Sequence, residues 1–157
     1  MVAAGELAGA VGLVWRDGAA RAYPVGWRDI EAGLQMARDS IFRIASMAKP
    51  VTAVATMILA EECLLKLDDR VNRWLPELAD RRVLKHPTGP IENTVPANRP
   101  ISVRDLLTMR MGFGFLLEGP CPILEAVARA HISLGAPDPA NPHTPDLWMQ
   151  QFGTLPL

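Results

Sequence analysis

The segment that most constrains the fold is the apolar run SMAKPVTAVATMILA, which begins at Ser46. Its apolar residues recur at the three- and four-residue spacing of a helix, and Ala53 and Met57 extend the apolar surface almost all round. Pro50 lacks a backbone N–H and is tolerated only in the first turn of a helix. We therefore expect a helix that begins very near Ser46 and is central to the fold, covered on several sides.

Two polar residues stand at the start of this helix, Ser46 and Lys49. Residues three apart share a helix face, so the Lys49 amine can reach the Ser46 hydroxyl. The partial positive charge of a helix N-terminus would stabilise an alkoxide on Ser46. Apolar neighbours such as Met47 and Val51 would desolvate the amine, and a neutral amine can accept the serine proton. The alternative is a chance spacing, with Lys49 extending into water.

The first part of the chain reads as a β-hairpin over about residues 8–28. Strand-like runs, Ala10 to Trp15 and Ala19 to Trp27, flank Asp17-Gly18, a dipeptide that suits the positive φ angles of a tight turn. Pro24 cannot donate a ladder hydrogen bond, so it predicts an edge position or a bulge.

The rest of the chain, 46–157, reads as mostly helical. LDDRVNRWLPEL predicts a short helix that stops at Pro76, and residues 81–100 lack periodicity, which indicates a surface loop. Ser102 and Asp105 form a capping-box pattern at the start of the next helix. A further short helix is expected from Ile123 to Ala130.

The final helix carries signals at both ends. Thr144 is placed as its N-cap, Pro145 as its first residue and Gly153 as its C-terminal stop. A hairpin followed by helices predicts the α+β class.

Composition excludes several functions. The 157 residues carry 16 basic and 17 acidic side chains, so no basic field for nucleic acid is expected. The apolar stretch from Pro50 to Ala60 is too short to span a membrane, and no secretory leader opens the chain, so a cytoplasmic protein is expected.

The cysteines, histidines and tryptophans are expected to have structural roles. Two cysteines, Cys63 and Cys121, are expected as free thiols. With three separated histidines they give no metal-site spacing, so neither a metal nor a cofactor is predicted. The tryptophans are expected to pack the core, although any could line a substrate cleft: Trp15, Trp27, Trp74 and Trp148.

Two longer strings carry a family resemblance. DSIFRIASMAKPVTAVATMILAEECLLKLDDRVNRWLPEL and ISVRDLLTMRMGFG closely resemble the serine beta-lactamase family, in the class C-like branch that also holds D-alanyl-D-alanine carboxypeptidases and family VIII carboxylesterases. The resemblance implies that Ser46 is the acylated nucleophile, that Lys49 accepts its proton and that the Ser46 N–H donates to an oxyanion. It implies a beta-lactamase/transpeptidase-like fold, and an ester or amide substrate: a β-lactam, a D-Ala-D-Ala peptide or a carboxylic ester.

The sequence also departs from the family pattern. Members are much longer and carry a Tyr-x-Asn motif and a Lys/His-x-Gly motif, whereas the single tyrosine here, Tyr23, precedes Ser46. Cys63 stands where relatives tend to have the glycine of a left-handed turn that ends the helix. We therefore expect residues 1–157 to be the N-terminal part of a single domain. The alternative is a catalytically incomplete piece that associates with a missing half or with another copy of itself.

Overall fold

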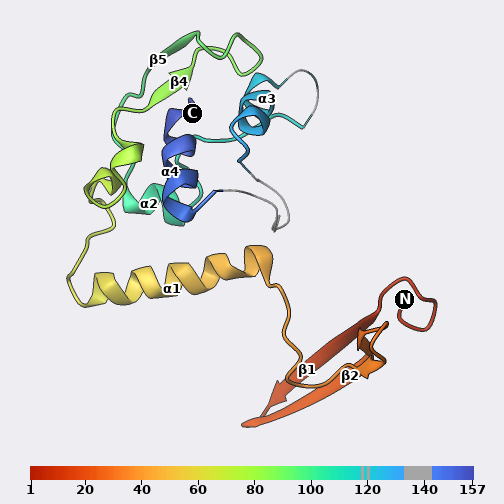
Figure 1. Ribbon diagram of the computed structural model, residues 1–157. Helices are drawn as coiled ribbons and strands as arrows, with labels where there is room; N and C mark the ends of the chain where they lie inside the picture. The colour runs from red at the N-terminus through yellow and green to blue at the C-terminus, as the bar shows by residue number, and fades with distance from the viewer. Residues whose placement is uncertain (118, 120, 133–142) are drawn as a thin grey trace. The chain divides into compact units, whose positions relative to one another are not determined.

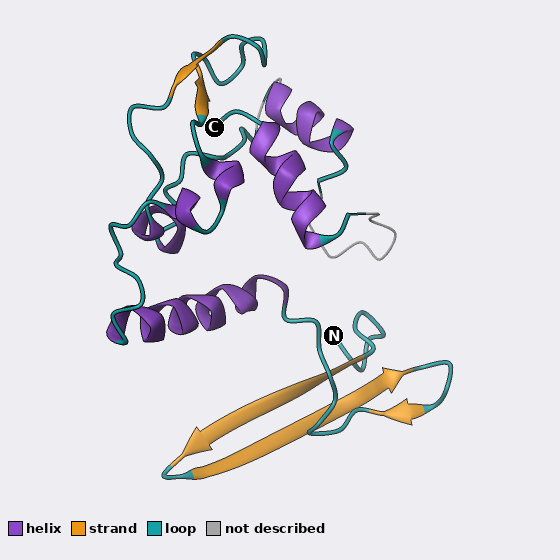
Figure 2. Ribbon diagram, turned by 60° about the vertical axis from the view of Figure 1, so that its left-hand side comes forward, coloured by secondary structure: helices purple, strands orange, loops and turns teal. Residues whose placement is uncertain are grey.

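The computed structural model describes residues 1–117, 119, 121–132 and 143–157. The chain divides into two compact units, residues 1–44 and 45–157. The first unit contains β-strands, and the second contains helices and a small two-stranded sheet (Figure 2). This mixture of an N-terminal antiparallel hairpin and helices is the predicted α+β class.

The first unit is built on a long hairpin (Figure 1). Strands β1 (Gly9–Arg16) and β2 (Ala19–Asp29) pair antiparallel. Asp17 and Gly18, between them, have φ angles of 50° and 79°, as a tight primed turn requires. The predicted hairpin is confirmed.

Pro24 lies on a part of β2 that is paired on one side. Its partner on β1 is Val11, while the short strand β3 (Leu34–Gln35) pairs with β2 at Trp27 and Asp29, across a register shift. The predicted edge position of Pro24 is therefore confirmed.

The second unit has one apolar core. Its elements are α1 (Ala48–Glu61), the 3-10 turns η1 (Ala45–Met47), η2 (Val71–Arg73) and η3 (Pro76–Leu78), strands β4 (Arg82–Leu84) and β5 (Thr94–Pro96), and helices α2 (Val103–Leu107), α3 (Pro122–Arg129) and α4 (Pro145–Thr154). The buried apolar side chains come from segments outside α1: Val71, Leu78, Ile101, Val103, Cys121, Ile123, Ala126, Val127, Ile132, Phe152 and Leu155. The helix predicted from Ile123 to Ala130 is confirmed as α3.

Two predictions between residues 65 and 100 are wrong. The expected short helix is instead a pair of 3-10 turns, η2 and η3, and Pro76 begins the second turn rather than stopping the first. The expected loop 81–100 contains the paired strands β4 and β5. Strands of three residues are too short to show an alternating pattern, so periodicity could not reveal them.

Helix α1 departs from its predicted environment. The structure describes all of its residues, and none of them is buried. Val51 and Val54 are 65% and 61% exposed. The prediction of a helix covered on several sides is wrong for this chain, because the core of the second unit is completed by other segments.

The start of α2 is held by a complete capping box. The Ser102 hydroxyl accepts a hydrogen bond from the Asp105 N–H at 3.2 Å, and the Asp105 carboxylate accepts one from the Ser102 N–H at 2.9 Å. Arg99 also donates to this carboxylate, which is buried. These contacts, led by Arg99, hold the pKa of Asp105 well below its ordinary value. The predicted capping box is confirmed.

Helix α4 begins as predicted but does not end as predicted. The Thr144 side chain accepts a hydrogen bond from the Leu147 N–H at 3.3 Å, and Pro145 is the first helical residue. Gly153 lies inside the helix instead of stopping it. A Cβ at this position would lie 2.9 Å from backbone and side-chain atoms of Glu77 in η3. The glycine therefore serves the close approach of α4 to η3.

Three of the four tryptophans lie outside the core. Trp148 packs against it and stacks on Phe152 with ring centroids 5.1 Å apart. Trp15, Trp27 and Trp74 are exposed, so the prediction that they pack the core is wrong. Both cysteines are free, as predicted.

Helix α1 ends at a residue in the left-handed conformation. Cys63 has a φ of 58°, as predicted from its position. Its N–H donates to the Ala60 carbonyl at 3.1 Å, and the Leu64 N–H donates to the Leu59 carbonyl at 3.0 Å. These two bonds form a Schellman motif, in which a side chain with a Cβ is disfavoured.

The Asp105 network predicts a pH-dependent stability. Since the pKa of Asp105 is lower in the folded chain than the ordinary value of about 3.9, its contribution is present above about pH 4 and is lost as the pH falls further. In urea unfolding, Asp105→Asn is expected to be less stable than the wild type at pH 7, and the difference is expected to shrink below pH 4. A difference that stays constant across this range would contradict the assignment.

The strained end of α1 predicts a stabilising substitution. Cys63→Gly removes a penalty of about 1–2 kcal/mol for a left-handed residue with a Cβ. The greater conformational freedom of glycine in the unfolded chain offsets about 0.4–1 kcal/mol of this gain. We expect the free energy of unfolding to rise by about 1 kcal/mol in urea titrations. Cys63→Ala, which removes the thiol but keeps the Cβ, is the matched control and should show no such gain.

Candidate active site

The two candidate catalytic side chains meet at the start of α1. Ser46 is the central residue of turn η1, and Lys49 lies in the first turn of the α-helix that follows. The Lys49 Nζ donates a hydrogen bond to the Ser46 Oγ at 2.8 Å. The contact that their three-residue spacing predicts is therefore present.

This contact has the geometry that proton transfer requires. A general base must lie within about 2.6–3.2 Å of the atom that gives up the proton. The separation of Ser46 Oγ and Lys49 Nζ falls within that range. With a neutral amine, the same pair of atoms would carry the hydrogen bond in the opposite direction, from the hydroxyl to the nitrogen.

The residue before Ser46 is strained. Ala45 has a φ of 42°, a left-handed conformation that costs a residue with a Cβ roughly 1–2 kcal/mol. Strained backbone of this kind tends to gather at functional sites, where the surrounding structure maintains it. Sequence reasoning missed it because alanine carries no signal for positive φ.

The expected apolar cover of Lys49 is not present. Lys49, Ser46 and the flanking Met47 and Val51 are all exposed. Neighbours in sequence cannot desolvate an amine when their side chains diverge round a helix and stay exposed to water. Met47, the N-cap of α1, makes no side-chain capping bond, so it does not compete for the N–H groups of the first turn.

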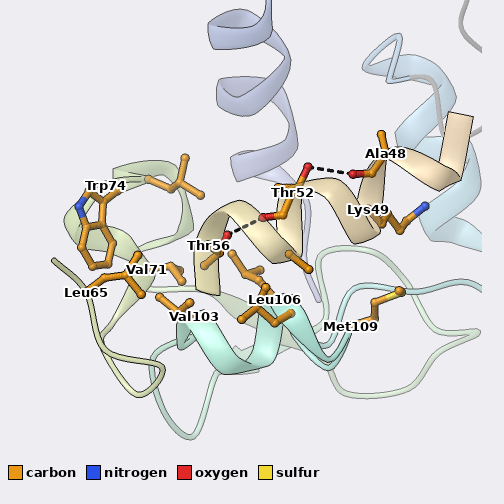
Figure 3. Close-up of a pocket in the computed structure, with 13 residues that line it drawn as sticks. Ala48, Lys49, Thr52, Thr56, Leu65, Val71, Trp74, Val103, Leu106 and Met109 are labelled. Atoms are coloured by element: carbon orange, nitrogen blue, oxygen red, sulfur yellow. Dashed lines mark hydrogen bonds between the residues drawn. The ribbon is translucent and has the colours of Figure 1, made fainter. Parts of the chain in front are cut away.

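A cavity of about 470 Å³ runs beside α1 within the second unit (Figure 3). One wall is a single face of α1: Lys49, Thr52, Ala53 and Thr56. The facing wall is apolar and includes Leu65, Val71, Trp74, Val103, Leu106 and Met109. Figure 3 shows Lys49 and Met109 toward one end and Trp74 and Leu65 toward the other.

The cavity contains residues that sequence reasoning did not assign. Thr52 and Thr56 lie three and seven positions after Lys49. This spacing places them on the same face of α1 as Lys49 and could have indicated them. Trp74 lines this cavity as well.

The described residues offer neither a metal site nor a membrane-spanning helix. In the described ranges, no group of three or more His, Cys, Asp or Glu side chains could hold a metal ion. Over the same residues, the longest apolar helices fall short of what a bilayer crossing needs.

A serine hydroxyl in contact with a lysine amine on an α+β chain is an arrangement of the serine hydrolase type. The family model described as beta-lactamase matches residues 1–143. The chain therefore belongs to the beta-lactamase family.

Individual relatives agree with this membership. An uncharacterized protein of Mycobacterium tuberculosis is 44% identical over 157 residues, which cover 98% of this chain and 36% of the relative. Esterase EstB of Burkholderia gladioli is 39% identical over 118 residues, or 73% of this chain and 27% of the esterase. A penicillin-binding protein of Bacillus subtilis is 32% identical over 69 residues, or 41% and 15% of the two chains. This chain thus spans about a third of the length of the mycobacterial relative.

Proposed function

We propose that this chain carries the nucleophile of a serine hydrolase that works through an acyl-enzyme, with Ser46 as nucleophile and Lys49 as its base. The observation that supports the proposal most directly is the 2.8 Å contact between Ser46 Oγ and Lys49 Nζ. The strained Ala45 and the helix start at Ala48 support it further, because they present Ser46 at an exposed turn.

The proposed reaction has two steps. Ser46 Oγ attacks the substrate carbonyl carbon while its proton moves to the neutral Lys49 amine. The bond from the carbonyl carbon to the leaving oxygen or nitrogen breaks, and the leaving group takes the proton from Lys49. Water then attacks the acyl-enzyme and gives its proton through Lys49 to Ser46, which releases the carboxylic acid and restores both side chains.

The names of two relatives support a proposal for the substrate class. One is an esterase and another a penicillin-binding protein. We therefore propose a small ester or amide, among them a β-lactam, a D-Ala-D-Ala peptide or a carboxylic ester.

A second candidate function is association rather than catalysis. The exposed apolar side chains of α1, with Val51 and Val54 more than half exposed, favour it. The partner would be further polypeptide of the kind that the longer relatives contain, or a second copy of this chain.

The proposal predicts a covalent adduct on Ser46. Incubation with a fluorophosphonate should add the phosphonyl group with loss of fluoride, and a penicillin should add its whole mass because its ring opens without a leaving group. Intact-mass measurement should show one adduct in the wild type and in Ser40→Ala, and none in Ser46→Ala.

The same experiment separates the two candidates. An adduct that persists in Ser46→Ala, or its absence from all three proteins, would contradict a nucleophilic Ser46. Absence of the adduct together with a mass that grows with concentration in light scattering would support association.

A further inference from the structure

The two long edges of the hairpin differ in what they offer to a further strand. In the part of the chain that the structure describes, the strand order is β1-β2-β3, so β1 has a neighbouring strand on one side alone. The outer edge of β2 is partly covered, because β3 pairs with its end (Figure 2). An uncovered strand edge presents backbone N–H and C=O groups that can pair with another chain. The outer edge of β1 is therefore a candidate contact surface.

The register of the hairpin shows which residues of β1 face outward. The Trp27 N–H donates to the Ala8 carbonyl at 2.9 Å, so Ala8 and Trp27 form a hydrogen-bonded pair. Such pairs alternate with non-hydrogen-bonded pairs along an antiparallel ladder, and the pairs of β1 and β2 continue from this one without a shift. The N–H and C=O groups of every second residue of β1 therefore point to the outer edge: Gly9, Val11, Leu13 and Trp15.

The same alternation shows that the outer edge of β2 is protected. Pro24 pairs with Val11 in a non-hydrogen-bonded pair, so the N–H that proline lacks would belong to this edge. Further along, the Gly26 carbonyl already accepts a hydrogen bond from the Met36 N–H at 2.9 Å. The run from Leu7 to Trp15, in contrast, has neither a proline nor a charged residue, the usual means of protecting an edge. The edge of β1 is thus the one open to a further strand.

The outer edge of β1 is complementary to itself. When two copies pair antiparallel about Gly12, all four outward residues pair with one another. Val11 then lies opposite Leu13 of the second copy, and Gly9 lies opposite Trp15 of the second copy. Each of these pairs can exchange two backbone hydrogen bonds. A shift of the register by two residues in either direction places one of the four opposite a residue outside β1.

The charges at the two ends of the uncharged run also suit this pairing. Glu6 precedes the run and Arg16 ends it, and their side chains are 65% and 87% exposed. Antiparallel pairing brings the end of one run beside the start of the other, so opposite charges approach at both ends. The Arg16 guanidinium already lies 3.3 Å from Asp17, but its five N–H donors can serve a second carboxylate.

We propose that two copies of this chain associate through β1, antiparallel and centred on Gly12, to form one continuous sheet. The inference rests on association, the second candidate function, and assigns it one partner and one surface. Leu13 and Trp15 are 61% and 68% exposed and lie on one face of β1, so pairing also withdraws apolar surface from water. The contact does not use Ser46, and Ser46→Ala should associate as the wild type does, whether or not Ser46 is a nucleophile.

A matched pair of proline variants tests which edge is used. Leu13 and Ala22 are partners in one non-hydrogen-bonded pair, so each directs its N–H to the outer edge of its own strand. In sedimentation velocity, the mass of the wild type should approach that of a dimer as the concentration rises. Leu13→Pro should raise the dissociation constant by about tenfold or more, since each dimer loses two hydrogen bonds. Ala22→Pro removes an N–H from the opposite edge and should associate like the wild type.

Circular dichroism checks that both proline variants fold. If either does not, Leu13→Lys and Ala22→Lys replace the pair, because a lysine on an edge strand opposes pairing without fixing φ. Association that weakens equally in both members of a pair would overturn the assignment to β1, as would a wild type that stays monomeric at every concentration.

A cross-link tests the register. A Cβ at Gly12 would meet only the Tyr23 Cβ, at 3.9 Å, so Gly12→Cys is accommodated. Opposite residues of a non-hydrogen-bonded pair have Cα atoms about 4.5 Å apart, within disulfide range. In the Cys63→Ala background, diamide should oxidise the two Cys thiols of a Gly12→Cys dimer to a disulfide, itself taking up the two hydrogen atoms.

Val14→Cys in the same background is the matched control for the cross-link. Val14 lies on the same face of β1 as Gly12, but the two copies of Val14 would be about 13 Å or more apart, too far for a disulfide. Non-reducing electrophoresis should show a cross-linked dimer for Gly12→Cys and little for Val14→Cys. Equal cross-linking of both variants would contradict the register. Association without a Gly12→Cys cross-link, unaffected by Leu13→Pro, would place the contact on the exposed face of α1 instead.

Discussion

The 3.6-residue period of α1 places both the contact between Ser46 and Lys49 and the cavity beside the helix. One helical turn places the Lys49 amine against the Ser46 hydroxyl, and the following turns place Thr52, Ala53 and Thr56 along the cavity. Pro50 restricts the register, because it is tolerated only in the first turn. The contact between Ser46 and Lys49 and the surface beside it are therefore consequences of one helix beginning at one point, and an insertion between Ser46 and Thr56 would separate them.

Charged groups order two places inside the second unit, and one of them lies next to the wall that faces α1. The Asp105 capping box orders α2, whose Val103 and Leu106 line the cavity. The Arg81 guanidinium donates to the carbonyls of Gly153 and Leu155 at the end of α4, and burial lowers the pKa of Arg81. A buried cation is tolerated there because the unpaired carbonyls at a helix C-terminus carry partial negative charge.

The sequence predicted those features that depend on neighbours in the chain. The hairpin turn, the capping box at Ser102 and the Ser46–Lys49 contact were each predictable from spacings of a few residues. Features that depend on distant partners were not. The inner position of Gly153 follows from the approach of η3, and the cavity arises where α1 faces segments far along the chain. The apolar pattern of α1 predicted burial, but periodicity cannot state what covers a helix.

The proposed activation of Ser46 by Lys49 can be tested by comparing lysine variants in one reaction. Lys49→Ala and Lys49→Arg are expected to lower the second-order rate constant for fluorophosphonate modification of Ser46 by about a hundredfold or more. Arginine keeps the charge but cannot take up a proton. Lys66→Ala, at another exposed lysine, should react like the wild type. Equal rate constants for the wild type and both Lys49 variants would contradict the role of Lys49 as the base.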